Sequence, residues 1–80
     1  MAIPTIKDFG AFKITMYFGD HNPPHFHIIG AGYRASVRIA DQAVMATKGK
    51  LPPRVLMRAR RWAADKRAAL EAIWIEYQRE

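Results

Sequence analysis

The fold is decided by the segment Phe12-Lys13-Ile14-Thr15-Met16-Tyr17-Phe18, in which apolar and more polar side chains alternate. Successive side chains of a β-strand point to opposite faces, so this period of two predicts a half-buried strand over residues 11–18. Residues 33–39 alternate in the same way and predict a second strand of this kind. Two such segments in the first half of the chain indicate a sheet with one buried face.

Short loops and further strands lie around these two segments. Residues 19–24 contain glycine, asparagine and two prolines and predict a loop, and residues 25–29 predict a strand that ends at a glycine turn. Residues 43–47 are a candidate fourth strand. Because every connection is short, we expect an antiparallel β-meander of three to four strands.

The second half of the chain is expected to be helical. Pro52-Pro53 suits a first helical turn, and the apolar residues that follow recur at helical spacing. Asp65 is either the N-cap of a second helix or part of one continuing helix. We therefore predict one α+β domain over residues 1–80, with one or two C-terminal helices packed on one face of the meander.

The size and composition of the chain limit what it can be. A domain of 80 residues buries a small core, so a homodimer, a partner chain or a bound metal ion is an expected source of further stability. Cysteine is absent, which excludes disulfides and thiolate metal sites. The sequence has no apolar run of about 20 residues and no signal-peptide pattern, so we expect a cytoplasmic protein without a membrane partner.

The net charge of +6 is unevenly distributed along the chain. Eight of the 13 Lys and Arg residues lie within residues 48–67, where Asp65 is the single acid; the eight are Lys48, Lys50, Arg54, Arg58, Arg60, Arg61, Lys66 and Arg67. Arg54, Arg58 and Arg61 recur at helical spacing and form a basic stripe. A concentrated basic zone is typical of proteins that bind RNA, another polyanion or an acidic protein, and a merely solvated helix face is the alternative.

All three histidines lie within seven positions, close to Asp20. His25 and His27 are two residues apart on the expected strand and so share one face, while Asp20 and His21 lie on the loop before it. Imidazole titrates near neutral pH, so these four side chains are candidates for general acid–base catalysis. They are also candidate ligands for a divalent transition metal such as zinc. A structural role for the histidines is the third alternative.

Residues 17–27, Tyr-Phe-Gly-Asp-His-Asn-Pro-Pro-His-Phe-His, form an unusual motif. With Gly49-Lys50-Leu51-Pro52, Trp62 and Trp74, they resemble the bacterial family catalogued as domain of unknown function 4160, over nearly the whole chain. The resemblance implies a short protein that forms one half of a two-gene cassette of the toxin–antitoxin type, with another small protein as its partner. It implies no chemical activity.

We therefore expect a protein that interacts with nucleic acid, RNA in particular, as the toxin-like member of a two-protein module. The catalytic candidates are Asp20, His21, His25 and His27, and the candidate nucleic-acid contacts are Arg34, Lys50, Arg54, Arg58 and Arg61. One alternative is a metal-binding domain or small metalloenzyme built on the four residues of the histidine cluster. Another is an interaction module that docks a small acidic protein through its basic helix. The sequence leaves open whether the chain is an enzyme.

Overall fold

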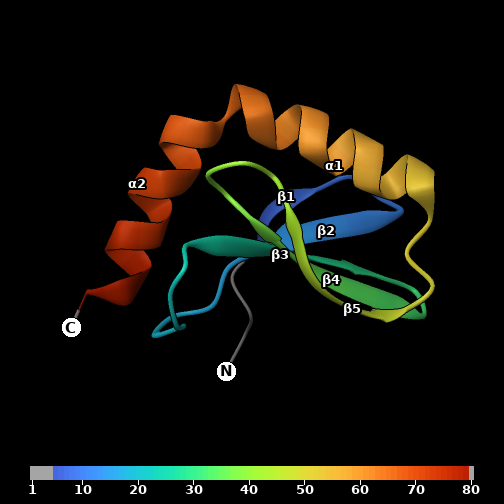
Figure 1. Cartoon of the computed structure of the whole chain (residues 1–80), viewed down its shortest axis with the longest axis horizontal. Helices are drawn as coiled ribbons and strands as arrows, with labels where there is room; N and C mark the ends of the chain where they lie inside the picture. Colours follow the sequence, from blue (N-terminus) through green and yellow to red (C-terminus); the bar gives the residue numbers. More distant parts are fainter. Residues whose placement is uncertain (1–4, 80) are drawn as a thin grey trace.

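A five-stranded antiparallel sheet is followed by two helices in the computed structural model, which describes residues 5–79 (Figure 1). The strands are β1 (Thr5–Asp8), β2 (Phe12–Thr15), β3 (His25–Gly30), β4 (Tyr33–Arg38) and β5 (Val44–Gly49), and the helices are α1 (Pro53–Asp65) and α2 (Arg67–Gln78). In the sheet the strands keep the order that they have in the chain. The predicted α+β meander with C-terminal helices is confirmed, with five strands in place of three to four.

The additional strand is β1, at one edge of the sheet. It has four residues, of which Ile6 is the single partly buried one, so it shows no alternation that sequence reasoning can detect. A tight turn joins it to β2. In that turn the Gly10 backbone N–H donates to the Asp8 carboxylate at 2.8 Å, and Gly10 has a φ of 90°, a conformation that favours glycine.

The register of the strands determines which side chains form the core. Residues directly opposite one another in antiparallel strands lie on the same face of a sheet. Ile14 lies opposite Ile28, and Ile28 lies opposite Ala35, so these residues share the inner face that packs against the helices. The buried residues of this face are Phe12, Ile14, Phe26, Ile28, Ala35 and Val37. The alternate residues of each strand lie on the outer face.

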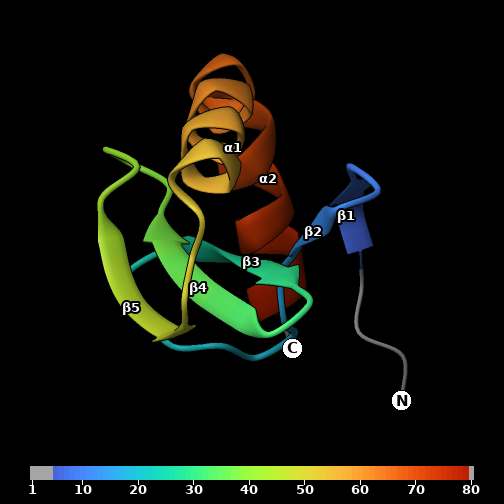
Figure 2. The ribbon, with the colours of Figure 1, turned by 90° about the vertical axis from the view of Figure 1, so that its right-hand side faces the viewer.

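The two helices cover different parts of the sheet. In Figures 1 and 2, α1 lies across the inner face, and α2 turns away from it and descends past the end of the sheet where β3 begins. Ala59 and Ala63 of α1, and Leu70 and Trp74 of α2, are buried in the same core as the strands. Within residues 5–79, neither helix is long and apolar enough to span a membrane.

Two sequence expectations need correction. Asp65 is the last residue of α1 and not an N-cap, because Lys66 separates the two helices and α2 has no side-chain cap. The strand expected over residues 11–18 ends at Thr15, although the alternation continues to Phe18. Phe18 is 57% exposed and packs against Tyr77 of α2, with ring centroids 4.4 Å apart.

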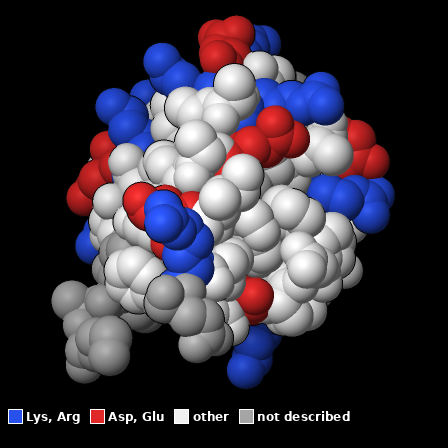
Figure 3. Space-filling view, turned by 90° about the vertical axis from the view of Figure 1, so that its left-hand side faces the viewer, with Lys and Arg blue, Asp and Glu red and all other residues white. Residues whose placement is uncertain are grey.

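The charges on α2 differ from those on α1. Figure 3 shows acidic and basic side chains mixed over the side of the molecule that α2 forms. On this helix Arg67 and Glu71 lie 3.9 Å apart, and beyond its end Arg79 contacts Glu76 at 3.2 Å. Four of the eight clustered cations lie on α1, namely Arg54, Arg58, Arg60 and Arg61, and no acid accompanies them on that helix before Asp65.

Candidate functional site

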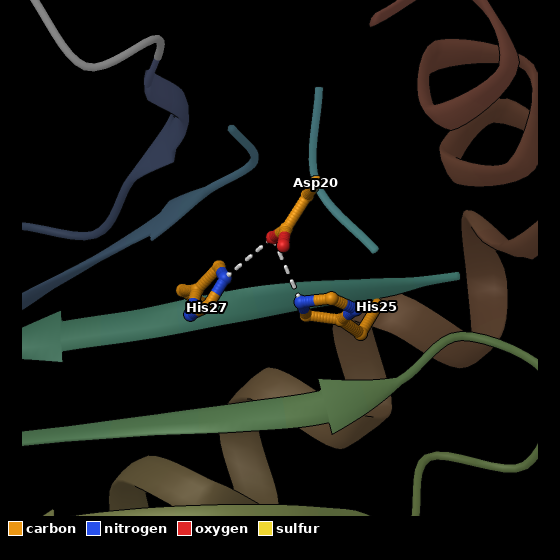
Figure 4. A group of neighbouring side chains, drawn as sticks. All are labelled: Asp20, His25 and His27. Atoms are coloured by element: carbon orange, nitrogen blue, oxygen red, sulfur yellow. Dashed lines mark hydrogen bonds and ion pairs between the residues drawn. The ribbon is translucent and has the colours of Figure 1, made fainter. Parts of the chain in front are cut away.

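The Asp20 carboxylate lies at the centre of the histidine cluster. Asp20 belongs to the loop between β2 and β3, and His25 and His27 are the first and third residues of β3. The Oδ2 atom of Asp20 lies 2.9 Å from Nε2 of His25 and 3.3 Å from Nε2 of His27 (Figure 4). His21 contacts the other oxygen, Oδ1, through its Nδ1 atom at 2.9 Å, and its side chain is 79% exposed. The structure thus gathers Asp20, His25 and His27 around one oxygen and leaves His21 at the rim.

Contacts with α2 and with its own backbone hold the Asp20 loop in place. The backbone N–H of Gly19 donates to the carbonyl of Tyr77 at 3.2 Å, and the side-chain amide of Gln78 donates to the carbonyl of Tyr17 at 3.3 Å. The backbone N–H of His21 donates to Oδ1 of Asp20 at 2.8 Å. The end of the second helix therefore positions a loop that precedes it by nearly 60 residues in the sequence.

His25 is buried and has a defined orientation. Its ring lies beside the indole of Trp74, with centroids 5.1 Å apart, and its side chain is 2% exposed. The Nδ1 atom lies 2.8 Å from the carbonyl oxygen of Pro23. A carbonyl oxygen can only accept a hydrogen bond, so Nδ1 carries the proton and Nε2 is the atom that faces Asp20.

The environment favours neutral His27 and ionised Asp20. Burial lowers the pKa of His27 below its ordinary value of 6.5, and the hydrogen bond to Asp20 offsets this only in part. Burial raises the pKa of the Asp20 carboxyl, but hydrogen bonds from the His21 backbone and from His27, with the charge of His25, outweigh that effect. The net pKa of Asp20 lies below its ordinary 3.8. At neutral pH the cluster therefore presents a carboxylate beside an uncharged His27 imidazole.

A pocket of about 460 Å³ opens beside His27 on the outer face of the sheet. Its polar lining residues include Tyr17, Asp20, His27, Arg34, Ser36 and Lys48. The ring of Tyr17 meets the His27 ring edge to face, with centroids 4.5 Å apart. Arg34 of β4 and Lys48 of β5 are directly opposite one another, so two cations lie side by side on this face. The pocket thus combines a carboxylate, an imidazole, a phenol ring and two positive charges.

The structure brings some of the expected cations to the pocket and separates others from it. Arg34 lines the pocket, whereas Lys50 follows β5 and does not. Lys48, which sequence reasoning did not select, takes the place expected for Lys50. Predicting Lys48 from the sequence would require knowledge of the β4–β5 register, which includes an irregularity between Ser36 and Val37.

The basic stripe lies on another surface of the molecule. Arg54, Arg58 and Arg61 are exposed on α1, which packs on the inner face of the sheet, whereas the pocket is on the outer face. Arg58 extends over the ring of Phe9, with its guanidinium carbon 4.8 Å from the ring centroid. Arg54 and Arg58 also border a second, mainly apolar pocket, formed by Ala11, Phe12, Pro52, Pro53 and Val55. The histidine cluster and the basic stripe are therefore two separate candidate sites.

Residues 11–75 match the model of a family described as "Domain of unknown function (DUF4160)". The chain belongs to this family. The matched region of the DUF4160 domain extends from just before β2 into α2 and includes both candidate sites. No curated protein and no solved structure matches the chain.

Proposed function

We propose that this DUF4160 domain interacts with RNA and holds a phosphate of the strand in the pocket beside His27. The observation that carries the proposal is the direct opposition of Arg34 and Lys48 on neighbouring strands. Like charges at directly opposed positions destabilise a sheet. No carboxylate within residues 5–79 forms an ion pair with either cation. An anion between them removes this repulsion, and phosphate is an anion that both side chains bind well.

The surroundings of the two cations favour a nucleic acid over a small free anion. Sites for single-stranded nucleic acid combine positive charge with aromatic rings on which bases stack. Tyr17 borders the same pocket, and β5 beside it is exposed along its whole length, so a strand can approach from solvent. Asp20 and His27 then lie next to the bound phosphate as the reactive groups of the site.

The proposal includes a role as the toxin-like member of a two-protein module. The resemblance of the motif at residues 17–27 to the family supports this step, together with the concentrated positive charge of the chain. A small acidic partner that covers the RNA pocket would then control the activity. Expression of the chain alone and with its genetic neighbour tests this role.

RNA binding is tested by removing the two pocket cations and, separately, two cations of the basic stripe. Labelled single-stranded RNA is titrated with the wild type, with Arg34→Gln/Lys48→Gln, and with Arg54→Gln/Arg58→Gln as the charge-matched control. We expect the pocket variant to bind at least about tenfold more weakly, and its log–log salt dependence to fall by about 0.7 for each phosphate that it no longer neutralises. A greater loss of affinity in the control variant would show that RNA binds to α1 and not in the pocket.

A second candidate function is docking of an acidic protein on α1. The mainly apolar pocket of about 620 Å³ beside Phe12 is bordered by Arg54 and Arg58. This arrangement fits an apolar side chain flanked by carboxylates, because the two arginines can pair with acids at the rim while the pocket takes the apolar group. The double variant Arg54→Glu/Arg58→Glu should abolish complex formation with the proposed small acidic partner. Unchanged affinity would exclude α1 as the docking surface.

A further inference from the structure

We infer that Asp20, His25 and His27 form a binding site for a divalent transition metal ion of the zinc class. Two imidazoles and one carboxylate are ligands that such ions take from proteins. One ligand atom of each residue lies within 4.8 Å of the ligand atoms of the other two. In Figure 4 the three side chains come from a loop and from one strand, and both imidazoles are directed at the Asp20 carboxylate.

The spacing of the donor atoms is close to that of a coordination shell. Bonds of about 2.0–2.1 Å from zinc to nitrogen or oxygen place neighbouring tetrahedral ligands about 3.3 Å apart. Asp20 Oδ2 lies 2.9 Å from His25 Nε2 and 3.3 Å from His27 Nε2. The widest separation in the group, up to 4.8 Å, shortens when the partly exposed His27 side chain rotates towards the ion. A small movement of one side chain would therefore bring all three donor atoms to coordination distance.

The hydrogen bond from His25 to the Pro23 carbonyl prepares His25 for metal binding. With the proton on Nδ1, a neutral His25 ring directs a lone pair from Nε2, and this atom lies 2.9 Å from a carboxylate oxygen, which is also an acceptor. Either a second ring proton or a metal ion between these two atoms makes their contact favourable, so the same geometry that holds a proton can hold a metal ion. Metal-binding histidines almost always donate their other ring N–H to a carbonyl or carboxylate, as His25 does to Pro23.

Contacts with the rest of the fold fix the positions of His25 and Asp20. Trp74 packs against the His25 ring, and the Gly19 and Gln78 hydrogen bonds tie the Asp20 loop to the end of α2. Two of the three ligands are therefore positioned by contacts that do not involve a metal ion. The conformational entropy lost on binding is correspondingly small.

Three protein ligands leave at least one coordination position for solvent or substrate. Asp20 and His27 both line the pocket that contains Arg34 and Lys48, so this position is next to the proposed phosphate site. The metal site depends on the three ligands alone, whereas its use on RNA rests on the proposed function. There the ion would stabilise negative charge on the bound phosphate.

Metal binding is tested on protein without a histidine tag, treated with a chelator and then dialysed. Calorimetric titration with ZnCl₂ should give one equivalent bound, and the Tm should rise by about 10 °C or more at a hundredfold excess over Kd. Asp20→Asn and His27→Gln should each weaken binding at least about 100-fold. His21→Gln is the matched control and should bind as the wild type does, because His21 is exposed and contacts the other carboxylate oxygen.

Cobalt gives a second measurement that reports on the ligands directly. Co²⁺-loaded wild type should show visible absorption bands of a low-coordinate site, and His27→Gln should alter these bands while His21→Gln leaves them unchanged. Absence of stoichiometric binding, or equal loss in the His21 and His27 variants, would overturn the inference. RNA titrations of the chelator-treated wild type distinguish the two proposals. If the protein binds RNA but no metal, only the metal site is wrong. If it binds metal but no RNA, only the proposed function is wrong.

Discussion

The imidazole of His25 packs on the indole of Trp74, with ring centroids 5.1 Å apart. This contact joins the first residue of β3 to the middle of α2, and both side chains are nearly completely buried. A change in the core at this point therefore affects the fold and the candidate site together.

Replacing Trp74 by alanine should destabilise the domain by about 3–5 kcal/mol, because it removes a large buried ring and leaves a cavity against His25. A domain of this size has little more stability than that, so we expect a large unfolded fraction at 25 °C. Urea unfolding measures the effect. Ile75 follows Trp74 in the sequence but is 63% exposed. Ile75→Ala should therefore change the free energy of unfolding by less than about 0.5 kcal/mol. Equal effects of the two substitutions would show that Trp74 is not part of the core.

Stability of the metal-free protein should fall on acidification below pH 6.5. The pKa of His27 is lowered in the folded state, chiefly by burial, so between the folded value and 6.5 the unfolded chain binds more protons than the folded one. This contribution to the free energy of unfolding is fully present above pH 6.5. It is lost as pH falls towards the folded pKa of His27, by at most about 1.4 kcal/mol per pH unit. Urea titrations between pH 5 and 8 in the presence of chelator measure this slope.

His27→Gln is the control for that measurement, because glutamine does not titrate and its variant should show a smaller slope over the same range. A second loss of stability belongs to Asp20, whose pKa is lowered, and it begins as pH falls below 3.8. If the wild type and His27→Gln lose stability in parallel between pH 5 and 8, the attribution to His27 is wrong.

The sequence predicts those parts of the fold that depend on local periodicity. The alternation in β4 gives the correct buried face, and the spacing of His25 and His27 correctly places both on one strand. The same rule fails at Phe18, because the chain leaves the sheet at Thr15 while the alternation continues. It also fails for β1, whose four residues have too few buried side chains to form a pattern.

The parts of the site that the sequence does not predict depend on contacts between distant segments. Asp20 meets the histidines because its loop is tied to Tyr77, which lies far along the chain. Lys48 meets Arg34 because of the β4–β5 register, which is irregular at Ser36. Residue types and local spacing therefore identify the candidate groups, whereas the three-dimensional path of the chain determines which cation lies beside them.

Gly49→Ala should disturb both the fold and the pocket. Gly49 has a φ of 77°, and a Cβ atom at this position would collide with the backbone carbonyl oxygen of Gly32. Gly10 has a φ of 90° but open space around its Cβ position, so Gly10→Ala isolates the cost of the backbone conformation. We expect Gly49→Ala to lose at least about 1 kcal/mol more stability than Gly10→Ala and to weaken RNA binding, because Lys48 precedes Gly49. Thermal unfolding and RNA titration of both variants test this. Similar losses of stability in the two variants would show that the contact between Gly49 and the Gly32 carbonyl oxygen is not the cause.

Expression of this chain alone should slow the growth of a bacterial host, and co-expression of its genetic neighbour should restore growth. The expected cause is RNA bound at Arg34 and Lys48 and acted on beside His27, so Arg34→Gln/Lys48→Gln and His27→Gln should each relieve the defect. Loss of one acid–base group costs about 10² to 10⁴ in rate, so we expect the growth defect to disappear. Circular dichroism and melting curves must show that both variants remain folded.

His21→Gln should remain toxic because His21 lies at the rim of the cluster, 79% exposed. A growth defect that persists in folded His27→Gln but disappears in Arg54→Glu/Arg58→Glu would instead assign the toxicity to capture of a host component by α1.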